Sequence, residues 1–294
     1  MDTRGSAGVA YALAAYTSWG LLPAYWRELR ELPALEVLLV RILGTALFAA
    51  LLLTASRRWP EVRAGLAKRR NIVALAASAL LISVNWLIFI WAVAQDQIVA
   101  TSLGYYLNPL MNVLLGIALL GERLRPLQLV AVAIAAIGVA SFAWSLGELP
   151  WISLALATSF ALYGLIRKTV PVASLAGLAI ETSLLAPIAV VVLAQQQRAG
   201  VGPFTQAAAH GPWVTTLLLG AGVVTAAPLI WFASAARRLR LATVGLFQYI
   251  APTLALALAV LVYGEPFTSA HAMAFGCIWT ALVLYSVELV RSRR

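Results

Sequence analysis

The sequence contains little charge and almost no cysteine. Only 11% of its 294 residues are Asp, Glu, Lys or Arg, and Cys277 is the single cysteine. An intrachain disulfide is therefore excluded, and so are a CxxC redox pair and the clustered Cys and His ligands of a structural zinc site. The two histidines, His210 and His271, lie at the edges of apolar runs. We expect the chain to bind no metal and no cofactor.

Motifs for catalysis and nucleotide binding are also absent. The sequence has no GxGxxG, no P-loop and no pair of carboxylates at a catalytic spacing. The formal net charge of +10 does not indicate nucleic-acid binding, because Lys and Arg form short clusters between apolar runs. We therefore expect neither an enzyme nor a nucleic-acid-binding protein.

Apolar residues, in contrast, are abundant. They make up 62% of the chain, and the mean hydropathy is +0.90, too high for a water-soluble fold. A helix needs roughly 20 apolar residues to cross about 30 Å of hydrocarbon. Ten runs of this kind predict an all-α integral membrane protein with ten transmembrane helices, and the first run is interpreted as a retained helix rather than a signal peptide. The runs fall near residues 7–26, 34–55, 72–94, 98–120, 127–146, 150–167, 174–196, 212–235, 241–263 and 268–289.

The distribution of Lys and Arg predicts the orientation of these helices. Seventeen of the 21 basic residues lie at the two termini and in the loops that the ten spans place on the same side. The loops on the other side hold only Arg27, Arg30 and Arg198, and Arg41 lies inside the second span. Because basic residues concentrate in cytoplasmic loops, we expect both termini in the cytoplasm.

The chain resembles itself at a nearly constant spacing. The segments GYYLNPLMNVLLGIALLGERL (104–124) and FQYIAPTLALALAVLVYGEPF (247–267) align, so that Pro109 matches Pro252 and Gly121-Glu122 matches Gly264-Glu265 at a spacing of 143 residues. Gly20 matches Gly164 at 144, and ALE at 34–36 matches AIE at 179–181 at 145. These matches predict two repeats, 1–148 and 149–294.

Each repeat holds five expected spans, and an odd number forces the second repeat to enter the membrane from the opposite side. Such inverted repeats are typical of secondary transporters, whose binding site lies near the membrane midplane between the halves. Duplicated membrane proteins also include channels, so a passive channel is a second interpretation.

Polar residues recur along one face of the span at 98–120. Thr101, Tyr105, Asn108 and Asn112 follow an i, i+4, i+7, i+11 pattern. A polar stripe within hydrocarbon must face protein or water. We therefore select Tyr105 and Asn108 as candidate substrate-binding residues.

Two prolines interrupt the matched spans of the repeats. Pro109 should leave the carbonyl of Tyr105 without its helical donor, and Pro252 should do the same for Gln248. We predict that Gln248 also binds substrate and that Pro109 and Pro252 act as hinges. The alternative is that the prolines only kink their helices while the polar groups satisfy one another across the helix interface.

Further aromatic and polar residues lie in the interior of the expected spans, away from the interfacial belt where Trp and Tyr normally gather. Together they would suit a solute with an aromatic or aliphatic side chain. For any one of them, packing between helices is the alternative role. The additional candidate substrate-binding residues are Trp19, Asn85, Trp86, Phe89, Ser159, Tyr163, Trp231 and Tyr249.

Among the ionisable residues within the expected spans we single out three, namely Glu36, Arg41 and Glu181. Charges inside a membrane are functional candidates by default. Because Glu36 and Arg41 are close enough to a span end to reach the interface, we favour a static ion pair or an interfacial anchor for this set. No carboxylate lies in the middle of the spans that carry the polar candidates, so no proton or sodium relay is predicted.

Three segments resemble a known family. TSLGYYLNPLMNVLLGIALLGERL (101–124), LPWISLALATSFALYGLIRK (149–168) and GLFQYIAPTLALALAVLVYGEPF (245–267) are similar to the RarD branch of EamA-type proteins, in the drug/metabolite transporter superfamily. The similarity extends over nearly the whole chain. It departs at Val40, where the branch often has a histidine beside the arginine at position 41.

The resemblance implies a ten-helix transporter in a bacterial-type inner membrane, working by alternating access around a central cavity. It implies that the partners are a small-molecule substrate and the lipid bilayer, and we expect a monomer. The expected activity is export of small metabolites, foremost neutral and aromatic amino acids. A broad-specificity drug exporter is the alternative within transport.

Overall fold

The computed structural model describes residues 3–120, 126–147, 149–236, 238–239 and 247–291, and all regular structure within these ranges is helical. The elements are α1 (Thr3–Arg27), α2 (Ala34–Ala55), α3 (Trp59–Leu66), α4 (Arg69–Ala94), α5 (Ile98–Leu120), α6 (Pro126–Leu146), α7 (Trp151–Thr169), α8 (Ser174–Arg198), α9 (Pro203–Ala209), α10 (Pro212–Ala236), α12 (Ile250–Ala257), a π-helical turn η1 (Leu258–Val262) and α13 (Ser269–Arg291).

Proline and glycine mark the ends of several helices. A proline occupies the first or second position of α3, α6, α9 and α10. Its missing N–H costs nothing there, because the first N–H groups of a helix have no intrahelical acceptor. Gly200 follows α8 with φ of +74°, and Gly264 follows η1 with φ of +67°. Glycine adopts this left-handed conformation without steric cost, which allows the chain to turn sharply after these helices.

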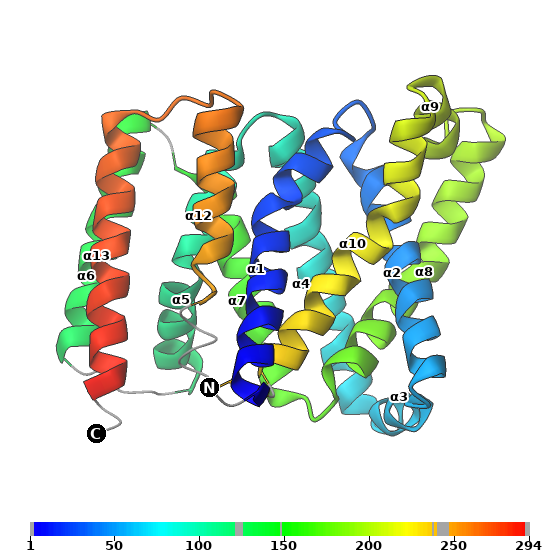
Figure 1. The fold of residues 1–294 in the computed structure, drawn as a ribbon, viewed down its shortest axis with the longest axis horizontal. Coiled ribbons are helices and arrows are strands. Elements are labelled where there is room, and N and C mark those ends of the chain that lie inside the picture. The colour runs from blue at the N-terminus through cyan, green and yellow to red at the C-terminus, as the bar shows by residue number, and fades with distance from the viewer. Residues whose placement is uncertain (1–2, 121–125, 148, 237, 240–246, 292–294) are drawn as a thin grey trace.

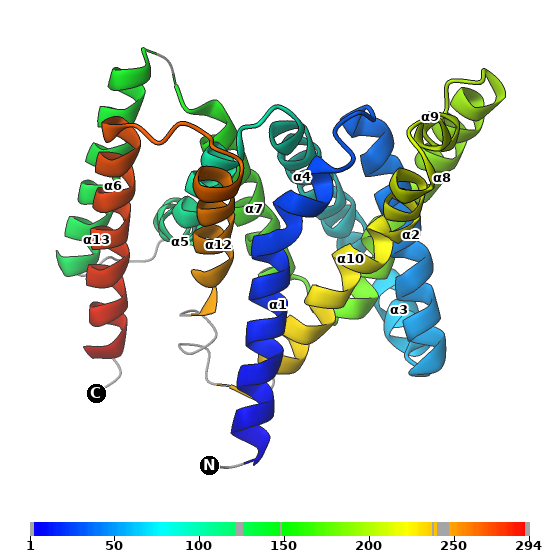
Figure 2. The ribbon, with the colours of Figure 1, turned by 45° about the horizontal axis from the view of Figure 1, so that its top comes forward.

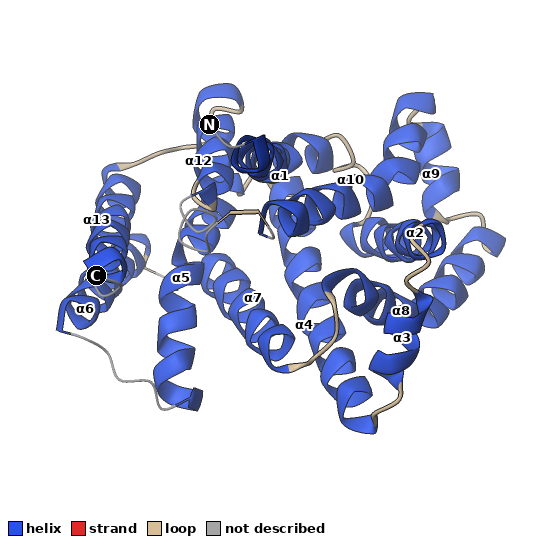
Figure 3. Ribbon diagram, turned by 60° about the horizontal axis from the view of Figure 1, so that its bottom comes forward, coloured by secondary structure: helices blue, strands red, loops and turns tan. Residues whose placement is uncertain are grey.

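The long helices run side by side as a bundle (Figure 1). α6 and α13 pair at one edge, while α2 and α8 pair near the other (Figures 1 and 2). Between these edges, α1 packs against α10 and α12, and α7 packs against α4 and α5. The view in Figure 3 shows α1, α4, α7 and α10 between the two edge pairs. The first turn of α1 and the last turn of α13 lie at the same end of the bundle (Figure 1).

The bundle is that of an all-helical membrane protein. Among the described residues, four helical segments are long and apolar enough to cross a bilayer: Ala34–Ala55, Arg69–Ala94, Ser174–Arg198 and Pro212–Phe232. Shorter apolar helical segments cover Leu129–Ser145, Ile250–Val262 and Ser269–Leu284. Within the described ranges a helix coincides with each of the ten expected spans. That ten helices cross the membrane, in two inverted repeats, stays a prediction.

The expected span at 241–263 differs from the observed structure. Residues 241–246 lie outside the described part of the chain, Gln248 and Tyr249 form a turn, and the helix from Ile250 changes to a π-helical turn at Leu258. Pro252 therefore lies in the first turn of α12 and not in mid-helix, where the sequence had placed it. Hydropathy alone gives no signal for such a change, because the apolar run is continuous across it.

Two short helices, α3 and α9, occupy segments that were expected to be loops. They contain 8 and 7 residues and lie at opposite ends of the bundle (Figure 1). A search for runs of about 20 apolar residues does not detect helices of this length. Each joins the second and third long helices of its half of the chain.

A close approach of backbones holds α2 against α10. Gly44 in α2 faces Gly222 in α10, and a Cβ added to Gly222 would lie 2.1 Å from the carbonyl carbon of Gly44. Small residues permit such contact between membrane helices, where packing rather than the hydrophobic effect drives association. The contact fixes the position of α2, which carries Arg41.

Candidate functional site

Arg41 lies in the interior of the bundle, and its charge is not neutralised by an ion pair with any described residue. Only 4% of it is exposed. The central carbon of its guanidinium group lies 4.0 Å from the ring centroid of Trp86 in α4 and 4.8 Å from that of Trp26 in α1. The Nε and Nη1 atoms of Arg41 are buried without a hydrogen-bond partner. Aromatic rings therefore contact the cation, while at least two of its nitrogens have no acceptor.

The buried carboxylates of the described chain all have other partners. Glu36 accepts hydrogen bonds from the Nε2 atoms of Gln196 at 3.1 Å and Gln206 at 3.2 Å. The carboxylate of Glu265 accepts hydrogen bonds from the backbone N–H groups of Ile98 and Val99, both at 2.8 Å. Neither carboxylate is available to neutralise Arg41. An ion pair between Arg41 and a neighbouring acid, one of the two roles expected for it, is absent from the described residues.

Glu265 closes the N-terminus of α5 from a different part of the chain. The first N–H groups of a helix have no acceptor within the helix, and the buried carboxylate of Glu265 supplies one. Burial raises the pKa of Glu265, and its hydrogen bonds to the two N–H groups oppose that rise. The match of Gly264-Glu265 to Gly121-Glu122 thus concerns a helix cap at one end of the repeat; Gly121 and Glu122 lie outside the described residues.

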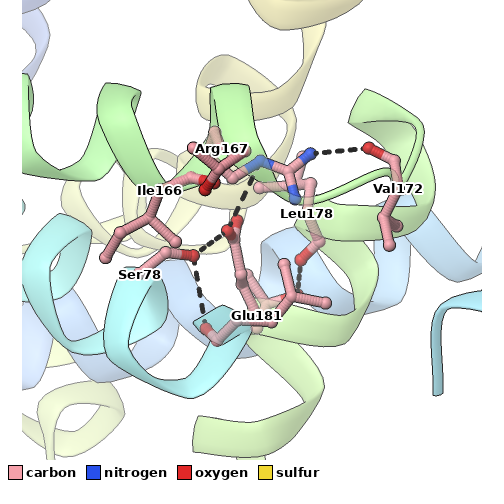
Figure 4. Close-up of polar contacts among 9 residues, drawn as sticks. Ser78, Ile166, Arg167, Val172, Leu178 and Glu181 are labelled. Carbon is pink, nitrogen blue, oxygen red and sulfur yellow. Dashed lines mark hydrogen bonds and ion pairs between the residues drawn. The ribbon is translucent and has the colours of Figure 1, made fainter. Parts of the chain in front are cut away.

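The third buried carboxylate, Glu181 in α8, belongs to a polar cluster with α4 and α7 (Figure 4). Its Oε1 atom lies 3.6 Å from Nε of Arg167 and accepts a hydrogen bond from the hydroxyl of Ser78. Arg167 also donates from Nη2 to the carbonyl of Val172 at 3.4 Å. This pair fits the static role expected for the intramembrane charges.

Tyr105 joins Arg41 to a row of aromatic rings. It lies close enough to Arg41 for an electrostatic interaction. Its ring centroid is 5.6 Å from that of Phe89 in α4 and 6.4 Å from that of Phe160 in α7. Phe160 continues the row to Tyr163 at 6.0 Å. Rings from α4, α5 and α7 thus form one apolar and polarisable surface beside the cation.

Several unpaired polar atoms share helix faces with the residues around Arg41. The Oγ1 atom of Thr45, the Oγ atom of Ser83 and the Oδ1 atom of Asn108 are buried without hydrogen-bond partners. Thr45 lies one turn beyond Arg41, Ser83 one turn before Trp86, and Asn108 one turn beyond Tyr105. Residues three or four apart lie on the same helix face. Buried polar atoms are normally paired, so these unpaired ones are candidate contacts for a ligand.

Asn85 and Ser159 lie together, as expected, but they bind each other. Nδ2 of Asn85 donates to Oγ of Ser159 and to the carbonyl of Leu156, both at 2.9 Å. The Ser159 hydroxyl donates to the carbonyl of Ala155 at 2.6 Å. These bonds join α4 to α7, which supports the packing alternative for these two residues.

The other candidates lie in separate surroundings. The ring centroids of Trp19 and Phe232 are 5.7 Å apart, and Tyr249 stacks on Tyr106 with the ring centroids 6.4 Å apart. Trp231 is half-buried in α10, and Gln248 is half-buried in the turn before α12. Pro109 lies inside a helix that continues without a break from Ile98 to Leu120. The carbonyl of Pro252 accepts a hydrogen bond from the Ser102 hydroxyl at 2.7 Å, which joins α12 to α5.

Four of the predicted residues therefore lie around one centre: Trp86 and Tyr105 beside Arg41, Phe89 against Tyr105, and Asn108 one turn further along α5. The sequence analysis missed Trp26 and Phe160, and it assigned Arg41 a structural role. One signal was available for Arg41, because it is the only Lys or Arg that lies inside an expected span and not at its end. The positions of the two aromatic residues depend on packing between distant helices.

Known proteins resemble this chain over nearly its whole length. The model of the EamA-like transporter family matches residues 6–144. An uncharacterized transporter of Pseudomonas aeruginosa is 47% identical over 98% of this chain and 95% of its own length. The protein RarD of Salmonella typhi is 43% identical over 98% of this chain and 97% of its own length. A crystal structure with 18% sequence identity covers 98% of this chain and 99% of its own, with a TM-score of 0.57, which supports the fold.

Proposed function

This chain belongs to the EamA-like transporter family and is a relative of the RarD proteins, and from that premise we propose that it exports small metabolites, foremost neutral and aromatic amino acids. It is a multi-pass membrane transporter with bacterial relatives and not an enzyme. The observation that carries the substrate proposal is the group of unpaired polar atoms beside the aromatic rings of Phe89, Tyr105 and Phe160. Such a site suits a solute with one polar end and one apolar side chain.

The proposed mechanism is alternating access between two inverted five-helix repeats, 1–148 and 149–294. The helix contacts support this proposal, because each half makes the same kinds of contact with the other half. α1 packs against α10 and α12, as the corresponding α7 packs against α4 and α5. α2 packs against α10, as α8 packs against α4. The short helices α3 and α9 also follow the second long helix of each half.

In this proposal both termini lie in the cytoplasm of a bacterial-type inner membrane. The charge distribution supports this orientation, and the first turn of α1 lies at the same end of the bundle as the last turn of α13. The protein would act as a monomer, since each copy contributes both halves around one centre. Pro109 and Pro252 remain proposed hinges, and the different helix positions of the two prolines imply that they would bend different parts of their helices.

Counterflow in proteoliposomes tests the substrate. Purified protein is reconstituted into vesicles loaded with an unlabelled amino acid, and uptake of the labelled amino acid is measured for phenylalanine, tyrosine, leucine, alanine and threonine. We expect exchange of the apolar and aromatic members, and empty vesicles give the background. If none of these amino acids exchanges, the substrate proposal is wrong.

Alanine substitutions test the candidate residues within that assay. Tyr105→Ala and Asn108→Ala should slow exchange while leaving the yield of folded protein unchanged, since both lie at the proposed site. Gln248→Ala should also slow exchange, and this prediction rests on the repeat alone. Trp144→Ala is the control, because Trp144 is 90% exposed on α6. Wild-type rates in all three test variants would remove these residues from the site.

The aromatic row also favours a second candidate function, the export of apolar drugs. Cells that express the protein would then tolerate apolar drugs but not raised concentrations of amino acids. A passive channel, the alternative from another class, predicts flux that does not increase when substrate is present on the far side. Counterflow therefore separates both alternatives from the proposed exporter.

A further inference from the structure

We propose that Arg41 binds the carboxylate group of the transported solute. This inference rests on the proposed transport function and narrows its substrate class to small molecules that carry a carboxylate and an apolar body. Amines, amides and uncharged drugs of the same shape are then poor ligands. The argument depends on the charge, the geometry and the surroundings of Arg41.

The charge of Arg41 requires a partner that the described chain does not supply. Burying a cation is strongly unfavourable unless an anion or a set of acceptors compensates its lost hydration. The buried carboxylates of Glu36, Glu181 and Glu265 all have other partners. The two tryptophan rings compensate part of the charge, since a cation over an aromatic face is attracted by the ring electrons. An anionic ligand would supply the rest.

The geometry leaves the guanidinium able to bind an oxyanion. The rings of Trp26 and Trp86 contact the guanidinium group at 4.8 and 4.0 Å. The N–H groups of arginine lie in the plane of the guanidinium, and those on Nε and Nη1 have no acceptor. Planar oxyanions such as carboxylates are the ligands that match these in-plane donors.

The surroundings suit the remainder of such a solute. The unpaired oxygens of Thr45, Ser83 and Asn108 can accept hydrogen bonds, and an α-ammonium group is a donor. The rings of Phe89 and Tyr105 provide an apolar surface for a side chain. A zwitterion with its carboxylate on Arg41 would therefore satisfy groups that are otherwise unpaired. A carboxylate without an ammonium group should also bind, but more weakly.

The test is isothermal titration calorimetry on the purified protein in detergent. The probes share one aromatic body: L-phenylalanine, phenylacetate, which lacks the ammonium group, and L-phenylalaninamide, which lacks the carboxylate. The proteins are the wild type, Arg41→Gln, Arg41→Lys and the control Arg63→Gln, in which an exposed arginine of α3 is replaced. Thermal unfolding without ligand establishes that each variant is folded.

We expect the wild type and Arg63→Gln to bind phenylalanine and phenylacetate at least about tenfold more tightly than phenylalaninamide, because a hydrogen bond to a charged group is lost in the amide. Arg41→Gln should lose about tenfold or more for the two carboxylates and nothing for the amide. The carboxylate affinity of Arg41→Lys should lie between those of the wild type and Arg41→Gln, since lysine keeps the charge without the planar donors. The unfolding temperature of ligand-free Arg41→Gln should equal or exceed that of the wild type.

Equal affinity for the carboxylates and the amide in the wild type would overturn the inference. Unchanged carboxylate affinity in Arg41→Gln would overturn it as well, and so would wild-type protein that binds neither carboxylate. Should Arg41→Gln fail to fold, Arg41→Lys decides the question, and full affinity in that variant contradicts a planar oxyanion site.

Counterflow of labelled phenylalanine by the same proteins separates this inference from the proposed function. Exchange that is the same in the wild type and Arg41→Gln leaves the transport proposal standing and removes the role of Arg41. Binding that depends on Arg41 without exchange of any amino acid has the opposite meaning: the carboxylate site stands, and the transported substrate is a different carboxylate.

Discussion

Replacing Gly222 by alanine should push α10 away from α2, the helix that carries Arg41. The added Cβ would lie 2.1 Å from the carbonyl carbon and 2.5 Å from the Cα atom of Gly44. Both neighbours are backbone atoms, so rotation of a side chain cannot relieve the clash. Since carbon atoms pack at about 3.5–4.0 Å, α10 must move from α2 by about 1 Å or more.

The size of the effect follows from this displacement. Overpacking of a well-packed interior costs about 1–3 kcal/mol. Substitution of the facing glycine, Gly44→Ala, should have a much milder effect. Its Cβ would lie 3.0 Å from the Cα atom of Gly222, and a shift of a few tenths of an ångström relieves this contact. Arg41 is carried by α2, three residues before Gly44, so Gly222→Ala should also weaken carboxylate binding.

Thermal unfolding of the purified variants in one detergent measures the difference. Gly164→Ala is the matched control, because the corresponding Cβ meets nothing within 4 Å and alanine is favoured over glycine in a helix by about 1 kcal/mol. We expect the unfolding temperature to fall in the order Gly164→Ala, Gly44→Ala, Gly222→Ala. Equal unfolding temperatures for Gly222→Ala and Gly164→Ala would refute the close approach of α2 and α10.

Three further substitutions test contacts elsewhere. Glu265→Ala leaves two buried N–H groups of α5 without acceptors and should cost about 1–3 kcal/mol. Glu61→Ala, which removes a surface ion pair with Arg58, should cost less than about 1 kcal/mol; thermal unfolding compares the two variants. Asn85→Ala should destabilise the joint between α4 and α7 by a similar amount, and counterflow by the folded protein should persist because its amide binds the chain itself. Glu181→Gln removes the counter-ion of Arg167 and should cost about 3–5 kcal/mol, part of which Arg167→Gln should restore in the double variant.

The positions of the long helices could be predicted from the sequence because hydropathy along the chain carries that information. The helices α2, α4 and α8 coincide with expected spans to within a few residues. The short helix α3 and the π-helical turn at Leu258 could not be predicted in this way. The first is too short to cross a membrane, and the second changes only the hydrogen-bonding register of an apolar run.

The candidate site could be predicted in part because helical periodicity places Tyr105 and Asn108 on one face. Their chemistry also depends on the partner helices, and the sequence does not give those contacts. Trp26 in α1 and Trp86 in α4 contact Arg41, although they lie 15 residues before and 45 residues after it in the chain. The sequence favoured an ion pair or an interfacial anchor for Arg41, and only the packed structure shows that the buried acids have other partners.

The repeat that organises the proposed transporter does not include its central charge. At the 145-residue spacing that aligns Glu36 with Glu181, Arg41 corresponds to Ala186, an uncharged residue in α8. A scaffold with two similar halves would then hold a single cation on one side of its pseudo-symmetry axis. An asymmetric solute with one carboxylate would bind in one orientation in both conformations, with its carboxylate on α2 throughout. The symmetry would allow the halves to exchange roles, while Arg41 would keep the substrate attached to the same helix.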